Sequence, residues 1–339
     1  MERPDNTMRY FQEHYDISPE IYYHYTSLEA LYNIVSSKTF RMTSLKSSND
    51  KKELSYRSGN FISDFKSMCD AEKDQNTKNY FKLILKSYNQ NTQTFSNLCT
   101  AKRTPYALCL SNCRDNLTHW DRYASNCTGV CIGVNLSALK VHFKRTPIEP
   151  FGMILFDVGD TLYTAETLKK YIRNTTINFI DWFQNLKSEN ETLEESILKN
   201  GYMCLAVICR RIMKFAKNGA FLDEDEVRLY HESESISDTL HLLNLMFYEG
   251  EDTKKRPTIK KYYKSLVEQL GLNEENFMIT KAGIRSYRNL CLEEVWGSGA
   301  IPEIILGPMC TQNKNELRRF LKANGLDKTK ISVSEIPIR

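Results

Sequence analysis

Apolar and polar residues alternate along the chain in patterns that predict both strands and helices. Residues 21–25 form an aromatic run typical of a strand, and apolar residues then recur at helical spacing through residues 28–35. Thr26 and Glu29 have the spacing of a capping box, which predicts that the helix starts directly after the strand. Residues 39–43 return as a second strand. The chain is therefore expected to begin with a strand, a helix and a strand.

Three later regions have helical character and are predicted to be insertions, at about residues 51–98, 164–215 and 231–275. A further helix is predicted at residues 315–324. Short apolar runs predict the remaining strands, at residues 106–111, 129–134, 153–158, 227–230, 304–306 and 331–338. No fixed-period repeat and no Pro/Gly/Ser-rich linker divides the chain, so we expect a single domain over residues 1–339.

Composition and charge narrow the class of protein. The 339 residues are 41% hydrophobic and 26% charged, as is usual for globular proteins, and the net charge of +4 leaves nucleic-acid binding open. Residues 1–6 are polar with no apolar stretch after them, so no signal peptide is expected. The densest apolar run, residues 202–209, is shorter than the roughly 18 residues of a membrane span. Ten cysteines in this context indicate reduced thiols, so we expect a cytoplasmic protein with no membrane partner.

Four cysteines, Cys109, Cys113, Cys127 and Cys131, are spaced as two C-x3-C pairs. Structural zinc sites use similar spacings on tight turns. Cys109 and Cys131 instead lie inside apolar runs that are predicted to be strands, where a free cysteine acts as a small hydrophobic residue. We therefore expect no bound metal.

Several polar residues are candidates for a functional site, and each also has a structural interpretation. His24 ends the first strand and could hydrogen-bond a ribose hydroxyl, although many histidines are only structural, and Thr26 could do no more than cap the helix. Residues 48–50 (Ser-Asn-Asp) with Glu53 are of interest beside His24, but Asn and Asp before a helix are ordinary caps. Trp120 and Tyr123 could stack on a planar heterocycle or fill the edge of the core.

Two carboxylates and an arginine are expected on one face of a late strand, because alternate strand residues share a face. These are Glu224, Glu226 and Arg228. One carboxylate could stabilise a developing cation while its neighbour orients a nucleophile, and Arg228 could keep a carboxylate ionised or bind a phosphate. The alternative is a solvated acidic loop.

A different chemistry is suggested by residues 156–162 (FDVGDTL), which resemble the nucleophile motif of haloacid-dehalogenase-type phosphatases with Asp157 as the phosphoryl acceptor. In that motif a second aspartate acts as the general acid, and Gly159 stands at its position here. The motif also lies in the middle of the chain instead of opening its domain. The phosphatase is therefore the weaker alternative.

Six stretches in order resemble an uncharacterised bacterial family of unknown function that is often met near phage-defence and toxin genes. They are YHYTSLEALYNIV, the SND…E cluster, ALCLSNCRDNLTHWDRYASNCTGVCIGV, KNGAFLDEDEVRL, IPEIILGP and ISVSEIPIR, and they span about residues 21–339. Asn218 and His119 depart from the residues common at those positions of the family.

That family resembles, more distantly, the His-Tyr-Glu branch of ADP-ribosyltransferases. The resemblance implies an α+β fold with a mixed, largely antiparallel sheet, an ADP-ribosyltransferase-like core and helical insertions. It implies that His24, followed by Thr26, contacts the ribose on the adenosine side of NAD, that Tyr123 covers the nicotinamide, and that Glu226 or Glu224 stabilises the sugar cation.

The expected function is NAD-dependent transfer of ADP-ribose to a protein, RNA or DNA acceptor, or hydrolysis of NAD, in a toxin or phage-defence effector. NAD would be the substrate, and no metal would be needed. The alternative is a sensor that binds a nucleotide or nucleic acid without chemistry.

Overall fold

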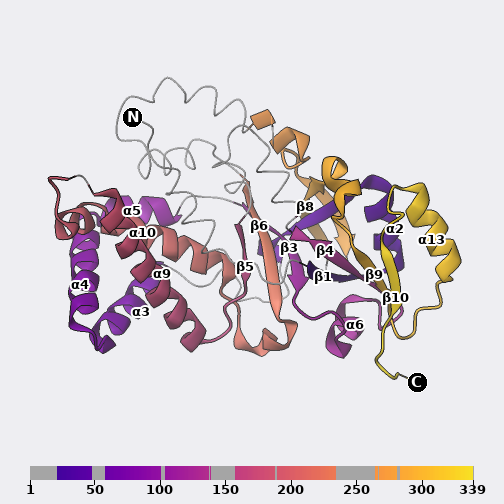
Figure 1. Cartoon of the computed structure of the whole chain (residues 1–339), viewed down its shortest axis with the longest axis horizontal. Coiled ribbons are helices and arrows are strands. Elements are labelled where there is room, and N and C mark those ends of the chain that lie inside the picture. The colour runs from indigo at the N-terminus through magenta and orange to yellow at the C-terminus, as the bar shows by residue number, and fades with distance from the viewer. Residues whose placement is uncertain are drawn as a thin grey trace.

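The structure is a computed structural model, and it describes residues 21–47, 58–100, 104–136, 138, 157–187, 189–233, 264–265, 267–280 and 283–338 (Figure 1). A ten-stranded sheet forms one half of the molecule and a group of helices forms the other. Among the helices that the structure describes, none is long and apolar enough to cross a membrane.

Eight of the ten strands follow the order β10-β9-β4-β1-β3-β2-β8-β7. The other two branch from this row, since β6 pairs with β3 and β5 pairs with β6. Within the described residues, β9 and β10 are parallel and every other strand pairing is antiparallel. The expected mixed, largely antiparallel sheet is therefore confirmed. The strands are β1 (Ile21–Thr26), β2 (Thr39–Ser44), β3 (Thr104–Ser111), β4 (Val130–Asn135), β5 (Asp157–Asp160), β6 (Glu226–Ser233), β7 (Asn276–Thr280), β8 (Gly283–Cys291), β9 (Glu303–Leu306) and β10 (Lys330–Val333).

One face of the sheet packs against α2 (Leu28–Ser37) and α13 (Lys314–Ala323). Apolar residues alternate along the strands, so that Tyr22, Leu108 and Ile132 all reach this core. The helix α6 (Leu117–Tyr123) lies on the other face, where Trp120 packs with Tyr25. Helices on both faces thus bury the central strands.

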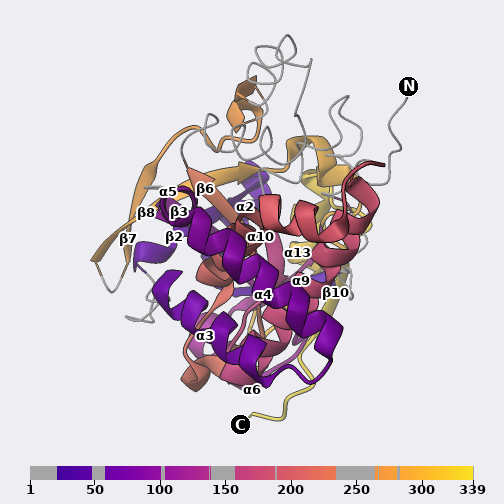
Figure 2. The same cartoon turned by 90° about the vertical axis from the view of Figure 1, so that its left-hand side faces the viewer.

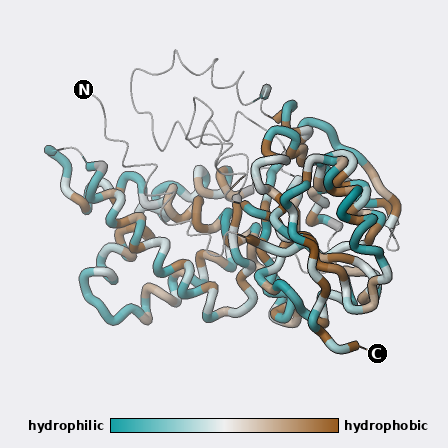
Figure 3. Tube along the Cα trace, turned by 45° about the vertical axis from the view of Figure 1, so that its right-hand side comes forward, coloured by the Kyte–Doolittle hydropathy of each residue, from teal (hydrophilic) through white to brown (hydrophobic). Residues whose placement is uncertain are grey.

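The helical lobe comprises α3 (Ser58–Ala71), α4 (Gln75–Gln90), α5 (Thr92–Thr100), α9 (Ala165–Leu186) and α10 (Leu193–Phe215). Figure 2 looks onto this lobe, with α4 lying across the front. Its apolar residues form a second core, separate from that of the sheet, so hydrophobic stretches appear in both halves of the molecule (Figure 3). Both long helices begin with capping boxes, at Thr164 and Thr192, which satisfy the exposed N–H groups of their first turns.

Most predicted elements are present, with three differences. The N-cap of α2 is Ser27, whose hydroxyl accepts from the N–H of Ala30 at 3.0 Å, and Thr26 belongs to β1. The hairpin β7–β8 was not expected, and the last strand, expected over residues 331–338, is the shorter β10. Predictions for residues 51–57, 153–156 and 234–263 lie outside the described residues.

Candidate functional site

A cavity lies where the sheet divides. One edge of β3 pairs with β6 along its whole length, from Thr104 to Ser111. The opposite edge pairs with β1 at Ser111, and with β2 at Ala107 and Tyr106. β1 and β2 therefore leave a gap along the middle of β3, and a cavity of about 210 Å³ opens there. It is lined by Tyr23, His24, Tyr25, Thr43, Ser44, Leu45, Cys109, Leu110, Ser111, His119, Tyr123, Lys217, Glu224, Glu226, Arg228 and Arg285.

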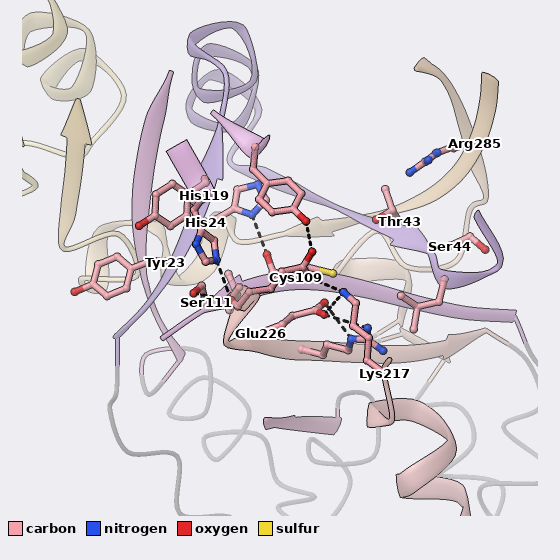
Figure 4. A pocket seen from close by; sticks show the side chains of 16 residues that line it. Tyr23, His24, Thr43, Ser44, Cys109, Ser111, His119, Lys217, Glu226 and Arg285 are labelled. Atoms are coloured by element: carbon pink, nitrogen blue, oxygen red, sulfur yellow. Dashed lines mark hydrogen bonds and ion pairs between the residues drawn. The ribbon is translucent and has the colours of Figure 1, made fainter. Parts of the chain in front are cut away.

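His24 occupies the β1 side of the gap. Its Nδ1 lies 3.1 Å from the carbonyl oxygen of Cys109, on the edge of β3 where neither β1 nor β2 pairs with that residue (Figure 4). A carbonyl oxygen can only accept, so Nδ1 carries the proton and Nε2 keeps a lone pair. Burial lowers the pKa of His24, and the bond to Cys109 only partly offsets that effect. The imidazole is therefore neutral near pH 7 and can accept a hydrogen bond from a ligand.

The carboxylates of Glu224 and Glu226, called here the glutamate pair, meet at one ammonium group. Lys217 Nζ lies 2.6 Å from Glu224 Oε2 and 2.7 Å from Glu226 Oε2. Arg228 donates to Glu226 with both arms of its fork, from Nε at 3.0 Å and from the terminal nitrogen at 3.1 Å. The Tyr123 hydroxyl donates to Glu224 Oε1. The charges of two carboxylates and two cationic side chains therefore compensate each other within one network of ion pairs and hydrogen bonds.

The cations determine the protonation of this network. Burial alone would raise the pKa of Glu226, but Arg228 and Lys217 outweigh it and lower the pKa to about 2. Burial would lower the pKa of Lys217, but Glu226 and Glu224 raise it above the ordinary lysine value. Burial and the neighbouring Glu226 raise the pKa of the Cys109 thiol well above its usual range. At neutral pH Glu226 is therefore ionised, Lys217 is charged, and Cys109 keeps its proton.

The backbone that carries the glutamate pair is fixed from several directions. Asp225 has a left-handed conformation with φ 39°, which ends the 3-10 helix η2 (Gly219–Glu224) and lets β6 begin at once. The carbonyl oxygen of Glu224 accepts from Ser111 Oγ at 3.0 Å and from His119 Nε2 at 2.8 Å. The N–H of Glu226 donates to the hydroxyl of Tyr163 at 2.8 Å. The two side chains therefore converge although they do not belong to one strand.

The structure brings together five of the seven residues selected from the sequence. His24, Tyr123, Glu224, Glu226 and Arg228 all line the cavity. The expected single strand for both glutamates was wrong, because β6 starts at Glu226 and Glu224 ends η2. Arg228 is 1% exposed, and its fork holds Glu226 while its remaining arm donates to the Lys214 carbonyl at 2.9 Å. Of its two expected roles, the geometry favours holding a carboxylate over binding a phosphate.

Thr26 and Trp120 lie outside the cavity. Thr26 is paired with Val130 at the end of β1. Trp120 is fully buried against Tyr25, and its indole N–H donates to Asp115. Its position fits the structural alternative, an aromatic residue that fills the core, and leaves no ring face for a ligand.

Sequence reasoning missed the lysine and two of the polar partners. Lys217, Tyr163 and Cys109 were not selected as site residues, and each touches the glutamate pair or its backbone. No local pattern marks Lys217, because its contact with the two carboxylates depends on how the chain passes from the end of α10 into η2.

The phosphatase interpretation finds no support in the topology. Asp157 lies in β5, which is antiparallel to β6, whereas that chemistry expects the aspartate at the end of a buried strand of a parallel sheet. Residues 48–50 and Glu53 lie outside the described residues. Of the four spaced cysteines, Cys127 and Cys131 are buried, and Cys109 lines the open cavity, where its surface is accessible although protein atoms surround the site. The described part of the chain contains no cluster of metal-ligating side chains.

Comparison with known proteins identifies one segment of the chain. Residues 119–229 match the family described as protein of unknown function (DUF2971). This segment runs from α6 to β6 and carries Tyr123, Lys217, Glu224, Glu226 and Arg228, but not His24. The match agrees with the expected resemblance to an uncharacterised family. No curated protein and no solved structure matches the chain.

Proposed function

We propose that the cavity binds NAD and breaks its bond to nicotinamide, as an ADP-ribosyltransferase-like enzyme or an NAD hydrolase. One observation carries the proposal: His24, Tyr123 and the glutamate pair come from distant parts of the sequence and line the same cavity. A histidine, an aromatic and a glutamate are the three groups that the resemblance implies for this chemistry. Their convergence is what such a site requires.

The proposed reaction uses these groups as follows. The bond between ribose C1′ and the nicotinamide nitrogen breaks, and its electron pair leaves with nicotinamide. A carboxylate of the glutamate pair stabilises the positive charge that develops on the ribose, as carboxylates do in glycoside cleavage. The neutral imidazole of His24 accepts a hydrogen bond at Nε2 from a ribose hydroxyl. An acceptor nucleophile or water then bonds to C1′ and loses its proton to solvent, so that ADP-ribose is transferred or released.

The size of the cavity limits how NAD could lie. Pockets that enclose whole drug-sized ligands measure about 300–1,000 Å³. A cavity of about 210 Å³ can therefore enclose only one part of a dinucleotide. The nicotinamide ribose is the part proposed to lie in it, because the glutamate pair and Tyr123 line it. Arg285, a residue of β8 that also lines the cavity, lies apart from Glu226 in Figure 4, so a longer ligand held at the glutamate pair could extend toward it.

A second candidate is a binding module without catalysis, and a specific observation favours it. Both oxygens of Glu226 are already held by Arg228 and Lys217, so much of its charge is neutralised. Such a carboxylate stabilises a developing cation less than a free one does. The same network would suit a site that binds a nucleotide and keeps its own geometry fixed.

Release of free nicotinamide from NAD by the purified protein tests the proposal. Glu226→Gln, Glu224→Gln and His24→Ala are compared with wild type, and turnover is expressed per folded molecule, since the first substitution is expected to destabilise the fold. We expect loss of one glutamate of the pair to lower kcat by about 10²–10³-fold, the usual effect of removing one well-placed electrostatic group. Glu316→Gln is the matched control, because Glu316 forms an exposed ion pair with Arg319.

The alternatives predict different results. NAD binding without nicotinamide release in wild type supports the binding module. Unchanged turnover in both folded glutamine variants contradicts the catalytic role of the pair. Absence of both binding and turnover contradicts the assignment of NAD.

A further inference from the structure

Two carboxylates share one ammonium group in the cavity. The contacts from Lys217 Nζ, 2.6 Å to Glu224 and 2.7 Å to Glu226, bring the two acidic groups close to each other as well. All three side chains are less than one tenth exposed, so water screens the charges weakly. Two carboxylates at such a site repel, and without a cation between them one takes up a proton.

The other groups around the pair cannot replace Lys217. On β6, Arg228 holds Glu226, and on α6, Tyr123 bonds only Glu224 and is neutral. From β3, Cys109 donates its thiol to Glu226, and Tyr163 bonds the backbone of Glu226. The remaining charged or titratable neighbours are His119, which bonds the carbonyl of Glu224, and Asp225, which adds negative charge. Among the contacts of the described residues, Lys217 is the bridge between the two carboxylates.

Lys217 is also held firmly in place. It follows the C-cap of α10, its N–H donates to the carbonyl of Leu162 at 3.0 Å, and its ammonium lies 5.1 Å from the centre of the Phe221 ring. Asn218, the next residue, caps η2, the helix that ends at Glu224. The position of the ammonium group is therefore set by the same short segment that positions one of its partners.

We propose that Lys217 is a positioning residue that compensates the negative charge of the glutamate pair and fixes the separation of its two carboxylates. The functional consequence rests on the proposed function, because NAD cleavage needs an ionised carboxylate beside the ribose. The charge-holding role itself does not depend on which ligand the cavity binds.

The test is a carboxyl titration of the protein labelled with ¹³C at the glutamate side chains, followed by NMR. Glu224→Gln and Glu226→Gln spectra assign the two signals. In wild type the carboxyl of Glu226 should stay ionised through the weakly acidic and neutral range, because its pKa is lowered to about 2. In Lys217→Met the pair should take up a proton at a pH about one to three units higher, the usual effect of an adjacent opposite charge. Lys217→Arg should retain the wild-type titration, and Lys82→Met, which removes an exposed lysine of α4, serves as the matched control.

A Lys217→Met protein that titrates like wild type overturns the proposal. If this variant does not fold, the ¹⁵N signal of the Lys217 ammonium in wild type decides instead. That group must hold its proton to higher pH than an exposed lysine, and release at the ordinary lysine pH overturns the proposal. Neither measurement requires NAD turnover, so a failure of the role proposed for Lys217 can be distinguished from a failure of the proposed function. Where turnover is present, its acid limb should move to higher pH in Lys217→Met and stay in place in Lys217→Arg.

Discussion

Replacing Glu226 with glutamine should destabilise the fold as well as affect any activity. The carboxylate accepts from Arg228 Nε through Oε1, and from the terminal nitrogen of Arg228 and Lys217 Nζ through Oε2. A glutamine offers one oxygen and one NH₂ group, so on one side a donor would face another donor. Arg228 is 1% exposed and would keep its charge with weaker compensation. Removing one partner of a buried ion pair typically costs about 3–5 kcal/mol.

The acid titration of Glu226 gives a second route to the magnitude. Its pKa falls from an ordinary value of 4.5 to about 2 in the folded protein. At 1.36 kcal/mol per pKa unit, this corresponds to about 3 kcal/mol of stability. A carboxylate with a lowered pKa stabilises the fold above the pKa of the unfolded chain, and the stability is lost as the pH falls through the folded value. Wild type should therefore lose this contribution between about pH 4.5 and pH 2.

Urea unfolding at neutral pH and through the acid range measures both quantities. Glu226→Gln should lower the free energy of unfolding by about 3–5 kcal/mol at neutral pH and show a weaker acid dependence than wild type. Glu316→Gln, in an exposed pair, should change it by less than about 1 kcal/mol. In a double-mutant cycle, Arg228→Met should cost much less in the Glu226→Gln background than in wild type. A loss below about 1 kcal/mol for Glu226→Gln would refute the reasoning, because the network would then contribute little.

Two further substitutions test the local structure around the site. Ser27→Ala should lower the free energy of unfolding by about 1 kcal/mol, because it removes the N-cap of α2. Thr26→Ala should lower it by less. Equal losses for the two variants in urea unfolding would contradict the assignment of Ser27 as the cap. Gly129→Ala should lower the melting temperature strongly, because the added Cβ would lie 2.2 Å from the carbonyl oxygen of Thr26. Gly59→Ala is the control and should leave the melting temperature nearly unchanged, because nothing lies within 4 Å of its Cβ position. Similar melting temperatures for the two variants would show that β1 and β4 can move apart at Gly129.

The helices and strands that could be predicted are those whose buried residues recur in the sequence with the regular spacing of a helix or form a continuous apolar run. α2, α10 and α13 bury apolar stripes, and β3 and β4 are apolar runs, so both kinds could be predicted. The hairpin β7–β8 has little apolar alternation toward a core, since β8 is mostly half-buried and polar. A strand held mainly by its backbone pairing to β2 leaves no such pattern in the sequence.

The candidate site was predictable only where a residue conflicts with its surroundings. A histidine in an aromatic strand and acidic residues before an apolar one stand out, and His24 and Glu226 were selected in this way. Thr26 and Ser27 are adjacent hydroxyl residues, and the capping-box spacing to Glu29 favoured the wrong one. Lys217 gives no local signal, because its role depends on the path of the chain from α10 to η2. That path is a tertiary property.

The position of the charged network follows from the alternation of β6. Val227 and Leu229 face the core of the sheet, so Glu226 and Arg228 must project from the opposite face. That face meets the end of α10, where Arg228 donates to the Lys214 carbonyl at 2.9 Å and Arg210 bonds Glu232 at 2.7 Å. The charges that line the cavity therefore also join the helical lobe to the sheet. Glu226 lines the cavity and accepts from Arg228, and the same arginine donates to the backbone of α10, so one carboxylate takes part in both the cavity and the contact between the two halves.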